Sequence, residues 1–300
     1  MPMGDPLAAP PRRSPEYRAL DERRGGSLSA ILAIARWTLR PLLRRPPFWM
    51  LIGLGWLGFL TTFTLIFVKA ELAAQNPGWA KALDRVRVTG TAAAFRDFLL
   101  FQARAVELIL AYVGVAGVLN DFRTGGLSFY LSKPISRWTY AAGKLLALAA
   151  IIGFVTLIPG VMLWLAAGWF NNGWEYWRDN LHALRGIVGY SLAIMIFESL
   201  ALLALASWFR KPAPLLVCWS ALFAGLAVLG GALEVQSGER GWRLLGLWWD
   251  IAIVGAYAFG APEDPLNWPY VKWAFAVLGG LALAAAWVVR RNLRAVEVVE

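Results

Sequence analysis

The strongest constraint on the fold of this chain is a set of long apolar stretches that carry almost no charge. Residues 46–68 are uncharged for 23 positions and residues 145–174 for 30. A helix that crosses a bilayer needs about 20 mostly apolar residues. Hydrophobic residues make up 59% of the chain and charged residues 16%, whereas soluble domains have about 45–50% and about 25%. The composition therefore excludes a disordered chain, a disulfide scaffold and an ordinary soluble enzyme, and it predicts an all-α integral membrane protein.

The same criterion predicts six membrane spans. Four are free of charge, whereas the second contains Arg104 and Glu107 and the fourth contains Glu198. The aromatic-rich residues 242–262 include Arg243, and a seventh span there would place the C-terminus on the side opposite to the N-terminus. We therefore expect short outer helices at 242–262, interfacial or re-entrant. The expected spans are residues 46–68, 98–119, 145–169, 186–208, 213–233 and 273–289.

The distribution of basic residues predicts that both termini are cytoplasmic. Cytoplasmic flanks of membrane helices collect Lys and Arg. The flanks on the side of the N-terminus hold 18 of the 29 Lys and Arg residues, and the flanks on the other side hold 10. The net charge of +10 is thus explained by topology, and we expect no nucleic-acid partner. The flanks assigned to the cytoplasm are residues 1–46, 120–144, 209–212 and 290–300.

The region before the first span is expected to have two parts. Residues 1–27, rich in Pro, Arg and Gly, predict a flexible cytoplasmic tail. Residues 28–45 predict a basic amphipathic helix lying on the cytoplasmic membrane surface, with residues 46–300 forming a single transmembrane domain. The alternative is a helix that simply begins the first span, although Pro41, Pro46 and Pro47 favour a break. The apolar stripe consists of Leu28, Ile31, Leu32, Ala35, Leu39 and Leu42, and the basic side of Arg36, Arg40 and Arg44.

The loop after the second expected span is predicted to contain a short amphipathic helix. Leu127, Tyr130 and Leu131 recur at helical spacing over one to two turns, and Pro134 ends the helix because proline cannot extend it. Ser136 is a suitable N-cap for the helix that enters the third span. A stripe this small cannot form a core. It must lie on lipid or dock in a groove on another protein.

This loop resembles the ABC-2 type permeases, the transmembrane subunits of one class of ATP-binding-cassette transporters. Their pattern is an acidic residue, a Gly-(Thr/Ser)-Leu turn, a Leu-rich helix, Ser-x-Pro-(Ile/Val)-Ser-Arg, an aromatic residue and Gly-Lys. Gly125-Gly126-Leu127 departs from the usual Gly-Thr-Leu, which loosens the start of the helix. The matching positions are Asp121, Gly126-Leu127, Leu131, Ser132-Lys133-Pro134-Ile135-Ser136-Arg137, Tyr140 and Gly143-Lys144.

The resemblance implies that residues 121–137 are a coupling helix that seats in a groove on a separate ATPase subunit. It also implies a second permease copy or homologue, and a multi-pass location in a bacterial cell membrane. The sequence has no Walker A motif, so ATP and Mg are expected only in the partner ATPase. The residues implied in coupling are Asp121, Arg123, Gly126, Leu127, Tyr130, Leu131, Ser132, Lys133, Pro134, Ser136 and Arg137.

Three ionisable residues within the expected spans are candidates for the transport pathway or a gate: Arg104, Glu107 and Glu198. A charge at the bilayer centre costs about 2.5–3.5 kcal/mol on insertion scales, so such residues usually have a partner or face a cavity. Arg104 and Glu198 lie at similar depths, which allows an ion pair between spans two and four. The three readings are therefore a substrate pathway, a structural ion pair, and an arginine that extends outward to the interface.

The expected function is that of a permease subunit, an exporter powered by an ATPase in trans. One alternative is a membrane scaffold that binds an ATPase without moving a solute. A remote alternative is a membrane-embedded lipid-modifying enzyme, for which Asp250, Glu263 and Asp264 are the only outer candidates. The single Cys218 and the single His182 exclude intrachain disulfides and two-His metal sites. We expect no catalytic residue, no metal site and no cofactor held by this chain itself.

Overall fold

The computed structural model describes residues 27–75, 90–123, 136–171, 173–260 and 265–294. These residues form helices and connecting turns, and no strand occurs among them. Six helical segments are long and apolar enough to cross a membrane, which confirms the predicted number. They extend over Pro46–Glu71, Ala92–Arg123, Arg137–Phe170, Leu181–Trp208, Pro212–Ser237 and Asn267–Leu293.

The helices are longer than the uncharged stretches, because polar residues at the ends of a span continue the helix beyond the apolar part. In chain order they are α1 (Ser27–Leu43), α2 (Pro46–Gln75), α4 (Ala92–Val113), η1 (Gly114–Val118), α5 (Leu119–Arg123), α7 (Arg137–Val155), α8 (Leu157–Phe170), α9 (Trp174–Asp179), α10 (Leu181–Trp208), α11 (Pro212–Ser220), η2 (Ala221–Gly225), α12 (Leu226–Ser237), η3 (Arg240–Leu245), α13 (Leu247–Ala258), η4 (Pro265–Tyr270) and α14 (Val271–Arg294).

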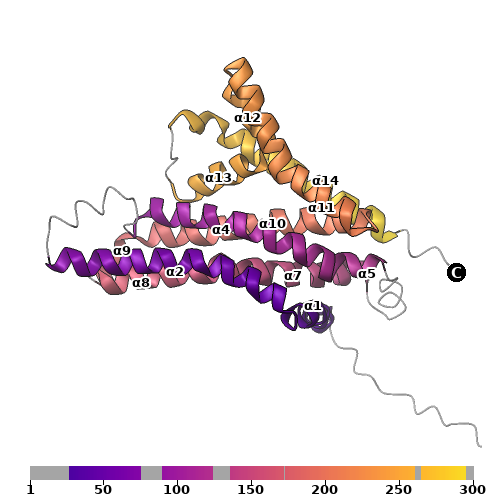
Figure 1. The fold of residues 1–300 in the computed structure, drawn as a ribbon, viewed down its shortest axis with the longest axis horizontal. Helices are drawn as coiled ribbons and strands as arrows, with labels where there is room; N and C mark the ends of the chain where they lie inside the picture. Colours follow the sequence, from indigo (N-terminus) through magenta and orange to yellow (C-terminus); the bar gives the residue numbers. More distant parts are fainter. Residues whose placement is uncertain (1–26, 76–89, 124–135, 172, 261–264, 295–300) are drawn as a thin grey trace, which may run out of the picture.

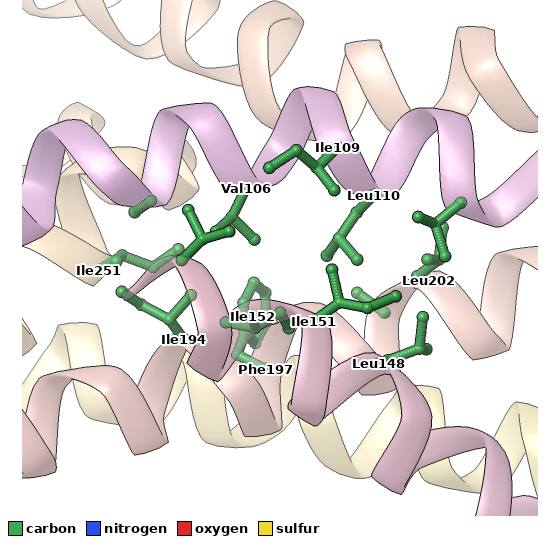
Figure 2. Close-up of a cluster of buried hydrophobic side chains, with 14 of the residues drawn as sticks. Val106, Ile109, Leu110, Leu148, Ile151, Ile152, Ile194, Phe197, Leu202 and Ile251 are labelled. Carbon is green, nitrogen blue, oxygen red and sulfur yellow. The ribbon is translucent and has the colours of Figure 1, made fainter. Parts of the chain in front are cut away.

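The core lies where α4, α7, α10 and α13 meet (Figure 2). Leu110, Ile152 and Leu202 are completely buried there. α4 and α10 are the most buried spans, whereas α2, α12 and α14 expose most of their apolar side chains. In Figure 1 the α11–α12 and α14 helices lean away from the bundle formed by α2, α4, α7, α8 and α10. Lipid, rather than a protein core, is thus the solvent for the outer helices.

The third span is interrupted near a proline, between α7 and α8. Pro159 has no N–H, so the carbonyl of Val155 loses its partner one turn earlier. α7 ends at Val155, and Thr156 departs from helical geometry with φ −108° and ψ −63°. The hydroxyl of Thr156 donates to the carbonyl of Ile152 at 2.9 Å. Two wider turns, the π-helical segments η1 and η2, interrupt the second and fifth spans.

The ends of the bundle are well separated. α1, α5 and the C-terminal end of α14 lie at one end, and α9 lies at the other (Figure 1). α1 ends at Leu43 before α2 begins at Pro46, and it packs along α7. Between the fifth and sixth spans the chain forms η3 and α13. α13 has 12 residues and is therefore about 18 Å long, too short to cross a bilayer.

Candidate functional site

The predicted coupling segment is described in the structure only at its two ends. Asp121 and Arg123 lie in α5, and Ser136 precedes α7, whose first residue is Arg137. The side-chain oxygen of Ser136 accepts a hydrogen bond at 3.1 Å from the backbone N–H three residues later, which confirms the predicted N-cap. The other predicted coupling residues lie outside the described part of the chain: Gly126, Leu127, Tyr130, Leu131, Ser132, Lys133 and Pro134.

A buried ion pair connects these two ends. Lys144 Nζ lies 2.6 Å from Asp121 Oδ2, and the Tyr140 hydroxyl donates to the same carboxylate oxygen at 3.2 Å. Lys144 is 1% exposed, and a buried charge of this kind is tolerated only when it is paired and hydrogen-bonded. Asp121, Tyr140 and Lys144 are called the clasp below. The clasp joins α5, which precedes residues 124–135, to α7, which follows them.

Neighbouring elements support the clasp from two directions. The Lys144 ammonium also donates to the carbonyl of Gly117, in the π-helical turn η1, at a long 3.5 Å. From the connection between α10 and α11, Arg210 donates to the carbonyl of Phe122 at 2.7 Å. Leu42 of α1 is completely buried and touches the space that a Cβ at Gly117 would fill. Contacts from η1, from the α10–α11 connection and from α1 therefore surround the clasp.

The sequence indicated part of this arrangement. Asp121 and Gly143-Lys144 both belong to the motif, but Lys144 is absent from the predicted coupling residues. The available signal was a single lysine at the start of an otherwise apolar span, since a charge in that position needs a partner. The structure thus gives Asp121 an intramolecular role, as the partner of that lysine.

The structure does not form the ion pair between Arg104 and Glu198 that their matching depths allowed. Glu198 is completely buried, and neither of its carboxylate oxygens has a hydrogen-bond partner among the described residues. Arg104 is exposed and points into a cavity. Arg104 and Glu198 lie at similar depths along their helices, but their side chains do not point toward each other.

The cavity that Arg104 lines has a volume of about 660 Å³ and lies between α4 and the C-terminal helices. Two other arginines line it, and each has an acidic partner: Arg96 pairs with Asp97 at 2.7 Å, and Arg243 pairs with Glu234. Arg104 has no carboxylate partner in the described part of the chain. The remaining wall is apolar and aromatic, including Trp248 and Trp249. Glu107 and Glu198 do not line this cavity.

Asp250, on α13, is a second completely buried carboxyl group. Neither of its carboxylate oxygens has a hydrogen-bond partner among the described residues. Burial raises the pKa of Asp250 from 3.8 to about 8 because removing the carboxylate from water disfavours its charged form. The side chain is therefore mostly protonated at neutral pH. The other two outer candidates, Glu263 and Asp264, lie outside the described residues.

Among the described residues, no group of three or more His, Cys, Asp or Glu side chains is arranged so that it could hold a metal ion. The chemical features that the structure does assemble are a clasp beside the loop at one end of the bundle and a cavity with an arginine in its wall.

Residues 32–236 match the model of the ABC-2 family transporter protein family. This match covers most of the chain, so the chain belongs to that family and is a multi-pass membrane permease component of an ABC transporter. The matched region includes both described ends of the coupling segment, the clasp and Arg104. A comparison with curated proteins found no match.

Proposed function

We propose that this chain is the permease subunit of an exporter in a bacterial cell membrane, driven by ATP and Mg that bind to a separate ATPase subunit. The observation that carries this proposal is the clasp. A buried Asp121–Lys144 pair links the two helix ends that flank residues 124–135, so a force applied to that loop is passed to α5 and α7 together. Membership in the ABC-2 family supports an ATPase as the source of the force.

The proposed substrate pathway passes the cavity lined by Arg104, and a second copy of the chain or a homologue completes the transporter. Glu107 and Glu198 are proposed to act in the gate rather than in substrate contact, because they lie outside the cavity wall. ATP-driven movement of the loop would switch the bundle between discrete packings with inward and outward access. With both termini cytoplasmic, the clasp lies on the ATPase side of the membrane.

Site-directed crosslinking tests the contact with the ATPase. In a Cys218→Ser background, a cysteine at Leu131 is expected to crosslink to the co-expressed ATPase subunit. A cysteine at Trp174, which is 77% exposed on α9 at the opposite end, is the matched control and should give no such product. Crosslinks from Trp174, or none from Leu131 in a complex that co-purifies, would contradict the proposed docking.

A second experiment distinguishes a transporter from a scaffold. A cysteine at Ala252, a half-buried residue of the cavity wall, is labelled with a membrane-impermeant maleimide in proteoliposomes that contain the ATPase partner. In a transporter, ATP and Mg should change the labelling rate several-fold. A scaffold would bind the ATPase and hydrolyse ATP, while the labelling rate at Ala252 stayed the same.

A further inference from the structure

A groove of about 610 Å³ runs between α1 and α7 at the end of the bundle that holds the clasp. One wall carries Arg36 and Arg40 of α1 and Arg44 of the turn that follows it. Arg36 and Arg40 are four residues apart and lie on one face of the helix, and Arg44 follows at the same interval. All three are exposed, and none has a carboxylate partner within the described ranges. The segment from residue 28 to residue 45 contains no Asp or Glu.

The opposite wall of the groove is apolar. Leu146 and Ala150 of α7 line it, and both are exposed to the outside of the bundle. Phe154, one turn further along α7, is 38% exposed and continues the same row. This apolar row begins beside the arginines and runs along α7 into the third span. A cationic patch that leads into an apolar track is complementary to a molecule with an anionic head and a hydrocarbon tail.

The arginine row is held in place by packing rather than left free on the surface. A Cβ at Gly143 of α7 would lie 2.7 Å from the Cβ of Ile34, so α1 and α7 approach each other closely only because that residue is glycine. Leu42 is completely buried, and the Trp49 indole donates to the carbonyl of Leu43 at 2.8 Å, which fixes the end of α1. A preorganised site loses less entropy when a ligand binds.

We propose that this groove is a specific binding site for one anionic phospholipid of the cytoplasmic leaflet. The phosphate contacts the row formed by Arg36, Arg40 and Arg44, and one acyl chain lies along Leu146 and Ala150. Guanidinium groups bind phosphate with charge-assisted hydrogen bonds. The inference rests on the proposed orientation of the chain and not on transport, because lipid binding is measured on the purified protein alone.

Native mass spectrometry of the full chain in detergent tests this site, with phosphatidylglycerol and phosphatidylcholine of identical acyl chains as probes. The wild-type protein should retain one phosphatidylglycerol molecule in preference to phosphatidylcholine. The double variant Arg36→Gln/Arg40→Gln should weaken phosphatidylglycerol binding by about 30-fold, since each basic residue contributes about fivefold near an anionic lipid. The double variant Arg290→Gln/Arg291→Gln removes two exposed arginines elsewhere at the same end and should leave binding unchanged.

A steric variant tests the apolar track independently. Ala150→Trp should displace the acyl chain and reduce phosphatidylglycerol binding, whereas Ala284→Trp, at an exposed alanine of α14 outside every groove described above, should not. Inorganic phosphate at millimolar concentration should fail to displace the lipid. The proposal is overturned if the wild type shows no preference for phosphatidylglycerol, if both arginine variants lose it equally, if Ala150→Trp binds normally, or if phosphate alone competes.

Discussion

Glu198 and Asp250 are completely buried carboxyl groups, and neither has a hydrogen-bond partner among the described residues. Lys144, by contrast, is equally buried but bonded to Asp121. Removing one partner of a buried pair leaves an uncompensated charge, whereas changing an unpartnered group removes no interaction. Substitutions at these positions should therefore have opposite effects on stability.

For Glu198→Gln, we expect the melting temperature of the purified protein to stay the same or rise, because no ion pair is lost. If Glu198 belongs to the gate, the ATP-dependent labelling change at Ala252 should be reduced while the fold is retained. Fluorescence-detected thermal unfolding in detergent measures the first effect. A fall of many degrees, or loss of folded protein, would restore the structural ion-pair interpretation.

Asp250 predicts a pH dependence of stability. Its folded-state pKa of about 8 lies above the ordinary value of 3.8, so the folded protein binds this proton more tightly than the unfolded chain does. The contribution to stability is complete below pH 4 and is lost as the pH rises through 8, by at most about 1.4 kcal/mol per unit. Between pH 6 and 9 the wild type should lose stability that Asp250→Asn does not lose. If the stability of the two proteins changed with pH in the same way, this assignment would be contradicted.

At the scale of the helices, the clasp should behave as a unit. Lys144→Met leaves the Asp121 carboxylate without its partner and should destabilise the protein by about 3–5 kcal/mol. Adding Asp121→Asn should recover part of this loss, since the remaining charge is then removed as well. Thermal unfolding of the two single variants and the double variant measures the coupling. Additive effects would mean that the pair does not stabilise the junction between α5 and α7.

The existence of the helices could be predicted from the sequence, whereas their interruptions and directions could be predicted only in part. Apolar length located six spans, and the break near Thr156 lies three residues before Pro159. The π-helical turns could not be found, because the residues of η1 and η2 are common in unbroken membrane helices. Likewise, counting residues gave the depth of Arg104 but not the direction in which its side chain points.

The α1 helix shows the same limit. Its apolar stripe was expected on one side, but the residues that pack against the protein are Ile34, Ala35, Thr38 and Leu42. Leu28 and Leu32, which belong to the expected stripe, are 74% and 61% exposed. One face of α1 therefore packs against the rest of the protein, and a second, apolar face is exposed on its surface. Which face contacts the protein depends on the position of Gly143 in space, and one-dimensional periodicity does not contain that information.

At the scale of the whole molecule, the exposed apolar surface is concentrated on the outer helices. Val228 and Leu283, on α12 and α14, are 73% and 74% exposed. A soluble protein would not tolerate so much apolar surface, whereas lipid or the proposed second copy covers it here. The compact part of the molecule consists of α4, α7, α8 and α10. The outer helices consequently depend on the membrane for their stability.

The orientation of the molecule is open to a direct measurement. In a Cys218→Ser background, Val235→Cys should react with an impermeant maleimide added outside intact cells, since Val235 is 87% exposed near the end of α12. Arg290→Cys, exposed near the end of α14, should react only after the membrane is permeabilised. The reverse pattern would place the clasp and the arginine row of α1 outside the cell.

The break at Thr156 divides the third span into two stiff helices, α7 and α8, that meet at a flexible joint. The first helix, α7, packs against α1 and is joined to α5 by the Asp121–Lys144 pair, whereas the second, α8, packs against α2 and α9. Because Pro159 removes a backbone hydrogen bond at the joint, bending there costs less free energy than bending within α7 or α8. If α7 tilts when the clasp end is pulled, bending at this joint would let α8 and α2 move less than α7.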